Sequence, residues 1–487
     1  MNTSDITSTG FNPTSEAMTK VLEAQREDFI NEGHVSVEVR IDRMKRGMNS
    51  IHKHQDLLIE ALNTDFSCRP RELSLLTDVA TSILPFKSAI KNVRQWMKPE
   101  KRKSLFPLGL LGGRSRIEFQ PLGVVGVLSP WNFPVNLTFG PTADILAAGN
   151  RVMIKPSEFT PSVSNVMADI VADAWDKNEV AIFTGGPEVG AAFSALPFDH
   201  MLFTGATSVA KHIMAAAAKN LVPVTLELGG KSPVLLGRSA NIKKAVTRIM
   251  LGKTMNAGQI CLAPDYLMVP EEKLEDVISE IKAAVNAMFP TMLNNPEYTS
   301  VINNRHLQRL QENLTDATEK GGEVISLAPA GEDFSAQHNT RKMPAAIIVN
   351  ATDDMRLMQE EIFGPLLPIK TYKHFEETIR YVNTQPRPLA LYYFGSDAKE
   401  EREVLDRTTS GGVCLNDVIM HTAQEDLPFG GVGPAGMGAY HGYDGFKNFS
   451  HAKSIYKQTK LDITRLAGIR PPYGATTETT IKLQTKL

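Results

Sequence analysis

The chain has 487 residues, 42% of them hydrophobic and 22% charged, with a formal net charge of −2 at pH 7. This composition is typical of a globular protein with room for two or three domains, and its balanced charge excludes a basic field that would attract nucleic acid. The cysteines are widely spaced, odd in number and outside any C-x-x-C pattern. This argues against a disulfide framework or a structural zinc site and favours a reducing cytoplasm. They are Cys68, Cys261 and Cys414.

The N-terminal part of the chain is predicted to be helical. The stretch before Pro13 is rich in serine and threonine and lacks an apolar segment, so we expect it to be disordered and not a signal peptide. Apolar residues then recur at helical spacing through the first hundred residues, and the last of these helices, over 71–97, is expected to break at Pro85. The chain has no apolar run of about 18 residues, so no transmembrane helix is predicted.

Short apolar runs separated by helical segments begin near residue 116. RIEFQP, at 116–121, alternates charged and apolar residues, which suits a strand with one wet face. Five buried strands with helices between them predict a doubly wound parallel sheet, which binds ligands at the carboxyl ends of its strands. The strands are expected at 124–128, 151–154, 180–184, 200–204 and 224–228, with helices ending near Gly149 and covering 160–176 and 207–219.

A second α/β unit is expected downstream. Its strand-like runs lie at 232–236, 266–269, 345–349, 389–394 and 411–416. The glycine-rich stretch 426–442 is interpreted as a surface loop, and the tail from Ser450 onward is polar.

Cys261, in MNAGQICLAPDY, follows Gly258 at the end of a helical segment, where a glycine lets the backbone turn and present a side chain to a cavity. A lone cysteine is more often a small buried hydrophobe than a nucleophile, and Cys68 and Cys414 keep that interpretation. Glu227 lies between two leucines in a predicted buried strand, where burial should raise its pKa and suit it to act as a general base. The alternative for Glu227 is an ion pair with a lysine such as Lys231.

Asn132, in SPWNFPVNL, follows the first apolar strand and could donate to a developing oxyanion, although an asparagine there is commonly turn chemistry. The stretch FTGATSVAKH (203–212) resembles a glycine turn entering a helix, whose amides could face a pyrophosphate. It lacks the full G-x-G-x-x-G fingerprint, so an ordinary βα turn is the alternative. Lys155 and Glu158 follow the second strand and could contact a ribose or form a solvated pair. His421 is interpreted as a loop histidine, and the sequence shows no cluster with metal-ligand spacing.

Taken in order, these motifs resemble those of the NAD(P)-dependent aldehyde dehydrogenase superfamily from about residue 20 onward. CLAPDYLMVP, GGVCLNDVIMH and GMGAYHG are similar to its class 3 branch. FPLGLLGGRSRIEFQPLGVVGVLSPWNFPVNLTFGP is similar to the bacterial coniferyl-aldehyde dehydrogenase subgroup. The matching stretches are PLGVVGVLSPWNFP, AAGNRVMIKPSE, FTGATSVAKH, VTLELGGKSP, MNAGQICLAPDY, EEIFGP and LPFGGVGPAGMGAYHG.

The resemblance implies a role for each catalytic candidate. Cys261 would be the nucleophile and Glu227 the general base. The side-chain amide of Asn132 and the backbone N–H of Cys261 would form the oxyanion hole.

The resemblance also implies the cofactor contacts. Glu361 would hold the nicotinamide ribose and Phe363 would lie against the nicotinamide end. Ala210 departs from the glycine that many members carry, which should alter helix packing more than cofactor identity. The remaining contacts would be Lys155 and Glu158 at the adenosine ribose, and Thr204, Gly205 and Ser208 near the pyrophosphate.

The implied architecture is α/β, aldehyde dehydrogenase-like. A helical N-terminus with a dinucleotide-binding domain would span 14–111 and 124–228, and a thiol-bearing catalytic domain 229–436. An oligomerisation hairpin at 112–123 would join a C-terminal segment at 440–487. We expect a soluble homodimer without a membrane anchor, because class 3 relatives are usually dimeric and this tail is polar.

The expected cofactor is NAD, with use of NADP left open. The expected substrate is a bulky apolar aldehyde, aromatic and coniferaldehyde-like by the subgroup resemblance, with a medium- or long-chain aliphatic aldehyde as the alternative. A CoA-acylating relative is disfavoured because a hydrolytic base at Glu227 would compete with CoA. A non-catalytic binding or structural protein is disfavoured by the presence of Cys261, Asn132 and Glu361.

Overall fold

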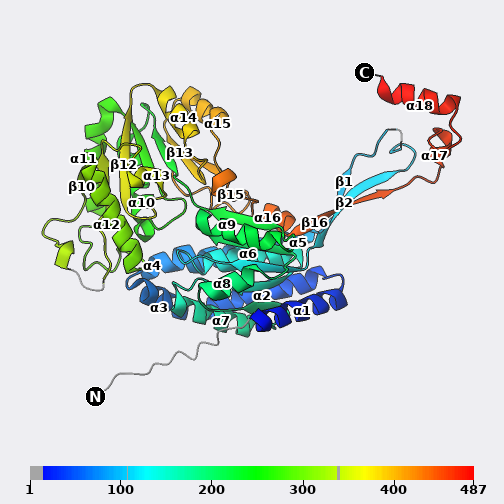
Figure 1. The fold of residues 1–487 in the computed structure, drawn as a ribbon, viewed down its shortest axis with the longest axis horizontal. Helices are drawn as coiled ribbons and strands as arrows, with labels where there is room; N and C mark the ends of the chain where they lie inside the picture. The colour runs from blue at the N-terminus through cyan, green and yellow to red at the C-terminus, as the bar shows by residue number, and fades with distance from the viewer. Residues whose placement is uncertain (1–14, 107, 337–339, 487) are drawn as a thin grey trace, which may run out of the picture.

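The computed structural model describes residues 15–106, 108–336 and 340–486, so the N-terminal stretch expected to be disordered lies outside the described residues. Over these residues Figure 1 shows two α/β bodies stacked on each other and an arm that projects to one side. The lower body carries the N-terminal helices, and the upper body carries the strands and helices between residues 233 and 415. The predicted α/β class, with parallel sheets, is confirmed.

The sheet of the lower body has the order β15-β7-β6-β3-β4-β5. From β7 to β5 its strands are parallel and almost wholly buried, which explains why each was recognisable as a continuous apolar run. The strands are β3 (Val124–Leu128), β4 (Arg151–Lys155), β5 (Val180–Ile182), β6 (His200–Gly205) and β7 (Val224–Leu228), with β15 (Gly436–Met437) antiparallel to β7. The associated helices are α1 (Ser15–Glu32), α2 (Val37–Lys53), α6 (Asn136–Ala148), α7 (Pro161–Ala174), α8 (Pro187–Ser194) and α9 (Thr207–Ala218).

The sheet of the upper body has the order β10-β11-β12-β9-β8-β13-β14. It is parallel except for the pairing of β10 with β11. Its strands are β8 (Pro233–Leu236), β9 (Tyr266–Pro270), β10 (Glu323–Ser326), β11 (Ala346–Val349), β12 (Leu366–Tyr372), β13 (Ala390–Phe394) and β14 (Gly412–Leu415). Its helices and helical turns are α10 (Ile242–Thr254), η2 (Met255–Gly258), η3 (Glu271–Lys273), α11 (Leu274–Met288), α12 (Asn304–Glu319), η4 (Phe334–Ala336), α13 (Arg356–Gln359), α14 (Phe375–Thr384) and α15 (Ala398–Arg407).

Strand β12 was not among the predicted strands, and it carries a proline, which is rarely found in a central strand. The register explains how the sheet accommodates Pro368. Residues 366–368 pair with β11 and residues 369–372 pair with β9, so the proline stands where β12 changes partner.

The expected break at Pro85 is wrong. The stretch consists of α3 (Gln55–Phe66), α4 (Arg71–Ser74), a π-helical turn η1 (Leu75–Val79) and α5 (Ala80–Trp96), and Pro85 lies inside α5. The hydroxyls of Thr81 and Ser82 donate to the carbonyl oxygens of Thr77 and Asp78 in the π-helical turn η1, where the usual α-helical backbone hydrogen bonds are interrupted. Pro85 is buried and α5 packs on α2 and α6, so tertiary packing offsets the lost N–H.

The continuous helical stretch Arg71–Trp96 is long and apolar enough to cross a membrane by length and composition alone. Its side chains Phe86, Ala89 and Val93 are fully buried in the protein core. This is the pattern of a core helix.

The glycine-rich stretch 426–442 is only in part the predicted surface loop, because residues 426–428, 433–434 and 437–438 are exposed while Phe429, Ala435 and Tyr440 are buried. It contains η5 (Gly433–Ala435) and β15, and Phe429 bridges to Tyr440, which is buried. Glycine permits this close packing: a Cβ on Gly436, at φ +142°, would lie 2.1 Å from the carbonyl oxygen of Leu226. The segment therefore packs on the edge strand of the lower sheet.

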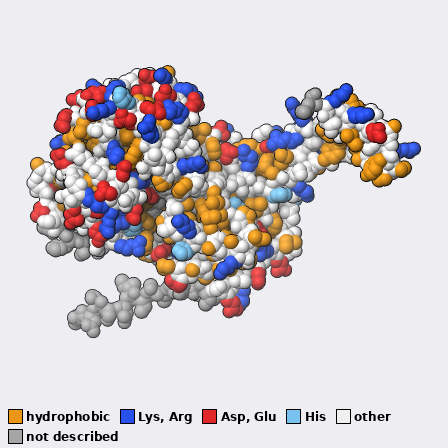
Figure 2. All heavy atoms as spheres, turned by 45° about the horizontal axis from the view of Figure 1, so that its top comes forward, with side chains coloured by type: hydrophobic (Ala, Val, Ile, Leu, Met, Phe, Trp, Pro, Cys, Tyr) orange, Lys and Arg blue, Asp and Glu red, His pale blue; other side chains and the backbone are white. Residues whose placement is uncertain are grey.

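The arm is an antiparallel sheet of β1 (Glu100–Arg102), β2 (Arg114–Pro121) and β16 (Ser450–Lys457), continued by α17 (Ile463–Leu466) and α18 (Ala475–Thr485). The short helix α16 (Gly442–Asn448) joins it to the lower body. Figure 2 shows hydrophobic side chains gathered along the arm. Those most exposed include Leu105, Phe106, Leu110, Leu466, Tyr473 and Leu483.

Candidate active site

Cys261 lies at the end of a turn in which consecutive residues have left-handed backbone conformations. After α10 ends, Asn256, Ala257 and Gly258 have φ angles of 50°, 52° and 70°. Gly258 is required by space as well, because a Cβ there would lie 2.3 Å from the carbonyl oxygen of Gly364. Such strain in residues other than glycine is typical of functional sites. The expected turn at Gly258 is therefore present, and it leaves Cys261 half-buried.

Glu227 lies near the carboxyl end of β7 and is 2% exposed. Among the described residues neither of its carboxylate oxygens has a hydrogen-bond partner. Burial raises its pKa well above the usual range of a glutamate. The alternative pairing with Lys231 is wrong, because the Lys231 amine instead bonds Asp265 and the carbonyl oxygens of Leu357 and Glu360.

The Cys261 thiol lies among carboxylates. Burial raises its pKa, and the carboxylates of Glu361 and Glu227 raise the pKa further. Hydrogen bonds from the backbone N–H groups of Cys261 and Leu262 lower the pKa of the thiol, but their effect is smaller. The resting group is therefore a thiol, and its proton must leave as the sulfur adds to a carbonyl carbon.

The side chain of Asn132 is buried beside the same loop. Its amide nitrogen donates to the carbonyl oxygen of Gln259 over 3.2 Å, two residues before Cys261. This bond fixes the amide against the turn that carries the thiol. A side-chain amide and backbone N–H groups near one sulfur are the donors an oxyanion requires.

The predicted cofactor residues lie at the carboxyl ends of β4 and β6. Lys155 ends β4 and donates to Glu158 over 3.1 Å. Thr204 and Gly205 end β6, and Thr204 stands opposite Glu227 in the register. Helix α9 then begins at Thr207 without a side-chain cap, and Ser208 in its first turn is exposed. Uncapped amides at the start of a helix suit a pyrophosphate, and the lysine and carboxylate after β4 suit a ribose, so these residues fit a dinucleotide.

Glu361 and Phe363 belong to the loop before β12, and the charge of Glu361 acts on the Cys261 thiol. Burial, followed by the charge of Asp265, raises the pKa of Glu361 to about 8. The Glu361 carboxylate lies against Gly229, and a Cβ on Gly229 would be 2.0 Å from Oε2 of Glu361. The other carboxylate oxygen, Oε1, has no hydrogen-bond partner among the described residues. Phe363 has a φ of 46° and meets the Trp131 ring edge-on at 5.3 Å.

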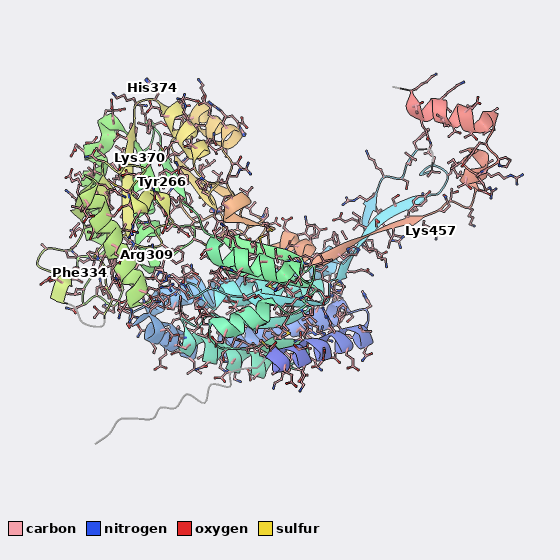
Figure 3. The ribbon with its side chains drawn as sticks, viewed as in Figure 1. Tyr266, Arg309, Phe334, Lys370, His374 and Lys457 are labelled. Atoms are coloured by element: carbon pink, nitrogen blue, oxygen red, sulfur yellow. The ribbon has the colours of Figure 1, made fainter. Side chains whose placement is uncertain are left out.

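Arg309, on α12, holds this loop by donating to the carbonyl oxygen of Ile362 over 2.8 Å (Figure 3). The carboxyl of Asp265 accepts from the N–H of the same residue over 3.0 Å. The loop that presents Glu361 and Phe363 is therefore anchored from two sides.

The sequence interpretation missed a buried cluster beside Glu227. Tyr440 is 1% exposed, and its hydroxyl has no partner among the described residues. Burial raises the pKa of Tyr440, with further contributions from the charges of Glu227, Cys261, Asp144 and Glu425. Burial also raises the pKa of Glu425 to about 7. The motif GMGAYHG was the available signal, but it was interpreted as loop.

Neither ring nitrogen of His421 has a hydrogen-bond partner among the described residues, so no such bond joins His421 to the thiol. Burial lowers its pKa to about 4, and its ring lies against Gly412. In the part of the chain that the structure describes, no group of His, Cys, Asp or Glu side chains could hold a metal ion.

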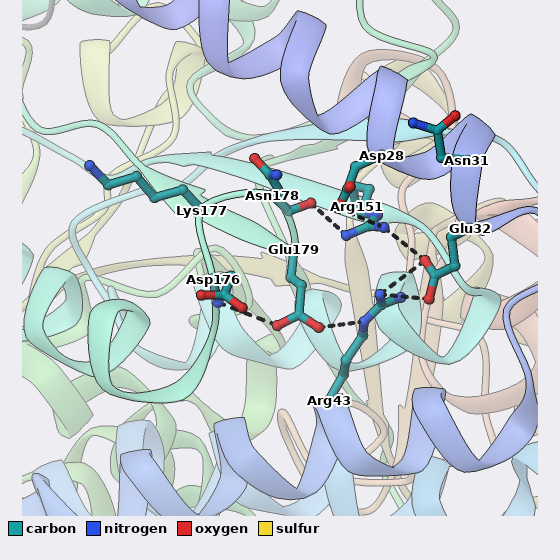
Figure 4. Close-up of a pocket in the computed structure, with 9 residues that line it drawn as sticks. All are labelled: Asp28, Asn31, Glu32, Arg43, Arg151, Asp176, Lys177, Asn178 and Glu179. Carbon is teal, nitrogen blue, oxygen red and sulfur yellow. Dashed lines mark hydrogen bonds and ion pairs between the residues drawn. The ribbon is translucent and has the colours of Figure 1, made fainter.

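A separate hollow of about 760 Å³ lies on the lower body (Figure 4). It is lined by ion pairs that join α1, α2 and β4, among them Arg43 with Glu32 and Glu179, and Arg151 with Glu32. The charges are paired with one another, which is the pattern of a structural network. The hollow contains none of the predicted site residues.

Comparisons with known proteins place this geometry in a family. A model described as the aldehyde dehydrogenase family matches residues 3–455. The chain is 56% identical to a probable coniferyl aldehyde dehydrogenase of Caulobacter vibrioides, over 94% of each chain. It is 50% identical to a coniferyl aldehyde dehydrogenase of a Pseudomonas species, again over 94% of each. A solved structure of Staphylococcus aureus AldH in a substrate-bound state superposes with a TM-score of 0.88 at 34% identity, covering 96% of this chain and 99% of that one.

Proposed function

This chain belongs to the aldehyde dehydrogenase family, and we propose that it oxidises a bulky aromatic aldehyde to the carboxylic acid with a nicotinamide cofactor. The observation that carries the proposal is the placing of the Cys261 thiol beside the buried Glu227 and the Asn132 amide. The names of the two coniferyl aldehyde dehydrogenase relatives support an aromatic substrate.

The reaction divides among the residues of the site. The Cys261 thiol loses its proton to water as its sulfur adds to the carbonyl carbon of the aldehyde, and the Asn132 amide with the Cys261 N–H binds the oxygen that becomes an anion. A nicotinamide cofactor held by Glu361 and Phe363 would supply the hydride acceptor that turns this adduct into a thioester. Glu227 takes a proton from the water that hydrolyses the thioester, and the acid leaves with the thiol restored.

We assign the cofactor to the carboxyl edge of the lower sheet. Lys155 and Glu158 would meet the adenosine ribose, and Thr204, Gly205 and Ser208 would approach the pyrophosphate at the start of α9. Glu361 would bind the nicotinamide ribose, and Phe363 would lie against the nicotinamide end. On this assignment residues 124–228 form the cofactor domain and residues 229–436 the thiol-bearing domain.

The free state of all three cysteines supports a cytoplasmic location.

The aromatic substrate can be tested with an aldehyde series. The side chains next to the catalytic groups, Phe133, Ile260 and Leu262, are buried and apolar. At about 25 cal/mol per Å², roughly 100 Å² of additional buried surface is worth about 2.5 kcal/mol, or roughly 70-fold. We therefore expect kcat/KM for coniferaldehyde to exceed that for acetaldehyde by about this factor. Benzaldehyde and octanal complete the series. A clear preference for octanal would contradict the aromatic substrate alone, whereas a preference for acetaldehyde would contradict a bulky substrate of either kind.

We expect NAD to be preferred over NADP. The Glu158 carboxylate would hydrogen-bond the ribose hydroxyls and repel a 2′-phosphate. The Glu158→Gln variant removes that charge and should raise kcat/KM for NADP relative to NAD by about tenfold, the effect of one unfavourable contact of about 1.4 kcal/mol. Steady-state rates with both cofactors at one aldehyde concentration measure the ratio. A native enzyme that strongly prefers NADP would overturn the role of Glu158.

We propose a homodimer assembled through the arm. Its hairpin and residues 440–487 expose many apolar side chains, and an uncovered sheet edge favours pairing across a two-fold axis. Light scattering should give twice the chain mass of 53.5 kDa. A single-chain mass would contradict the proposal, and a tetramer would contradict only the resemblance to class 3.

A further inference from the structure

We propose that the buried ion pair between Arg69 and Asp78 is a positioning device for the oxyanion hole. In this inference, which rests on the proposed function, the pair fixes the backbone of Asn132 and thereby the amide that faces the reacting oxygen. Neither residue touches the reacting atoms, so both act through Asn132.

Arg69 reaches Asn132 directly. One guanidinium nitrogen donates to the backbone carbonyl oxygen of Asn132 over 2.8 Å, and another donates to Thr77 Oγ1 over 3.2 Å and to the carboxylate of Asp78. Both charged side chains are 0% exposed. The guanidinium also lies over the rings of Phe66, at 4.8 Å, and Phe133, at 5.1 Å. The planar fork is therefore held in one orientation.

Asp78 holds the other end of the same backbone segment. One carboxylate oxygen accepts from the N–H of Val135 over 3.1 Å, and also from the N–H of Asn136 at 3.5 Å. The segment 132–136 is thus fixed at its start by Arg69 and at its end by Asp78. Asp78 belongs to the π-helical turn η1. Such turns are frequent at functional sites, and this one carries the residue that bonds the Asn132 segment.

The Cys261 turn is tied to the same carbonyl group from the opposite side. The Asn256 amide donates to the Asn132 carbonyl oxygen over 3.2 Å and to the Gln259 carbonyl oxygen over 3.3 Å. The Asn132 amide returns a bond to Gln259. The Asn132 carbonyl is therefore a shared acceptor between Arg69 and the turn that carries the nucleophile. A shift of Arg69 would move the amide relative to the thiol.

Folding stability alone does not account for this arrangement. Burying two charges costs desolvation energy that their attraction often only balances, so well-packed apolar residues serve stability equally well. A guanidinium provides what an apolar residue cannot, namely forked donors at fixed angles to Asn132 and Asp78. The placement of one fork arm on the carbonyl of Asn132 points to positioning.

The test is a double-mutant cycle between Arg69 and Asn132. Arg69→Lys keeps the charge beside Asp78 but removes the fork, and should lower the rate of the pre-steady-state NADH burst by about tenfold or more, since misplacement near 1 Å can cost about 100-fold. In the background of Asn132→Ala the same substitution should change the burst rate less than about twofold, because the amide that Arg69 positions is gone. Dissociation constants for NAD should be unchanged in both backgrounds.

Arg40→Lys is the matched control, because Arg40 is also buried and donates to the carbonyl oxygens of Val35 and Ala147 without contacting the site. It should leave the burst rate unchanged. If Arg69→Lys fails to fold, the uncharged pair Arg69→Met/Asp78→Asn replaces it in the cycle, with the melting temperature as the measure of folding.

An equal loss in both Asn132 backgrounds, or no loss in either, would overturn the inference while leaving the proposed function intact. A native protein that forms no NADH with any aldehyde would instead overturn the proposed function.

Discussion

Cys261→Ser should lower dehydrogenase turnover to below about 1% of the native rate, because a serine hydroxyl is a far poorer nucleophile near neutral pH. The substitution barely changes side-chain volume, so the left-handed turn before Cys261 should keep its shape. NAD should bind with unchanged affinity, since the residues assigned to it lie mainly at the ends of β4 and β6. Stopped-flow fluorescence of NADH measures the burst, and calorimetry measures the binding of NAD.

The matched control for this substitution is Cys414→Ser. Cys414 is buried in β14 and, in the part of the chain that the structure describes, is likewise a free cysteine. That variant should retain turnover, although its stability can fall because a hydroxyl replaces a buried sulfur. Turnover of a few per cent or more in Cys261→Ser would remove Cys261 as the nucleophile. Loss of turnover in Cys414→Ser without unfolding would implicate the second thiol instead.

Glu227→Gln should retain the NADH burst and lower the steady-state rate by about 100-fold or more, the usual range for loss of a general base. The amide is close to isosteric but cannot accept a proton from water. Deacylation in the native enzyme should also rise with pH. Burial raises the pKa of Glu227, so the carboxylate that acts as base becomes populated only as the pH approaches that raised value. The variant should lose this dependence.

The Glu425→Gln variant tests whether the pH dependence of deacylation comes from Glu425 instead of Glu227. Burial raises the pKa of Glu425 to about 7, so this carboxyl also titrates in the working range. If Glu425→Gln abolishes the pH dependence while Glu227→Gln leaves the steady-state rate unchanged, Glu227 is not the essential base. The rate of thioester hydrolysis, followed after the burst at several pH values, gives the comparison.

Local patterns were enough to predict the parallel strands, because both faces of β3, β4, β6 and β7 are buried and their sequences are continuously apolar. The same reasoning missed β12, since the change of partner at Pro368 is a property of the whole sheet. It also placed a break at Pro85, where packing of α5 on α2 and α6 offsets the missing N–H. Short-range rules describe a residue's own backbone but not the elements that will cover it.

The candidate site also contains residues that sequence motifs predict and residues that only the folded structure reveals. The residues with recognisable motifs, Cys261, Glu227 and Asn132, were found from sequence, and the structure brings their loops together. Tyr440 and Arg69 were not found, because their importance depends on partners far away in the chain. Arg69 contacts Asn132 across 63 residues, and a buried ion pair has no sequence signature. The interpretation of Lys231 as a partner of Glu227 failed because Asp265, from another loop, competes for the lysine.

The pairing of β15 with β7 joins two segments that are synthesised far apart in time. Gly436 stands opposite Glu227 in this pairing, yet the ribosome adds it roughly 200 residues later, which takes about 10–40 s at about 5–20 residues per second. Until then the edge of β7 that β15 covers has no strand beside it. The nearly complete burial of Glu227 in the folded protein therefore includes a contact that only a nearly complete chain can make.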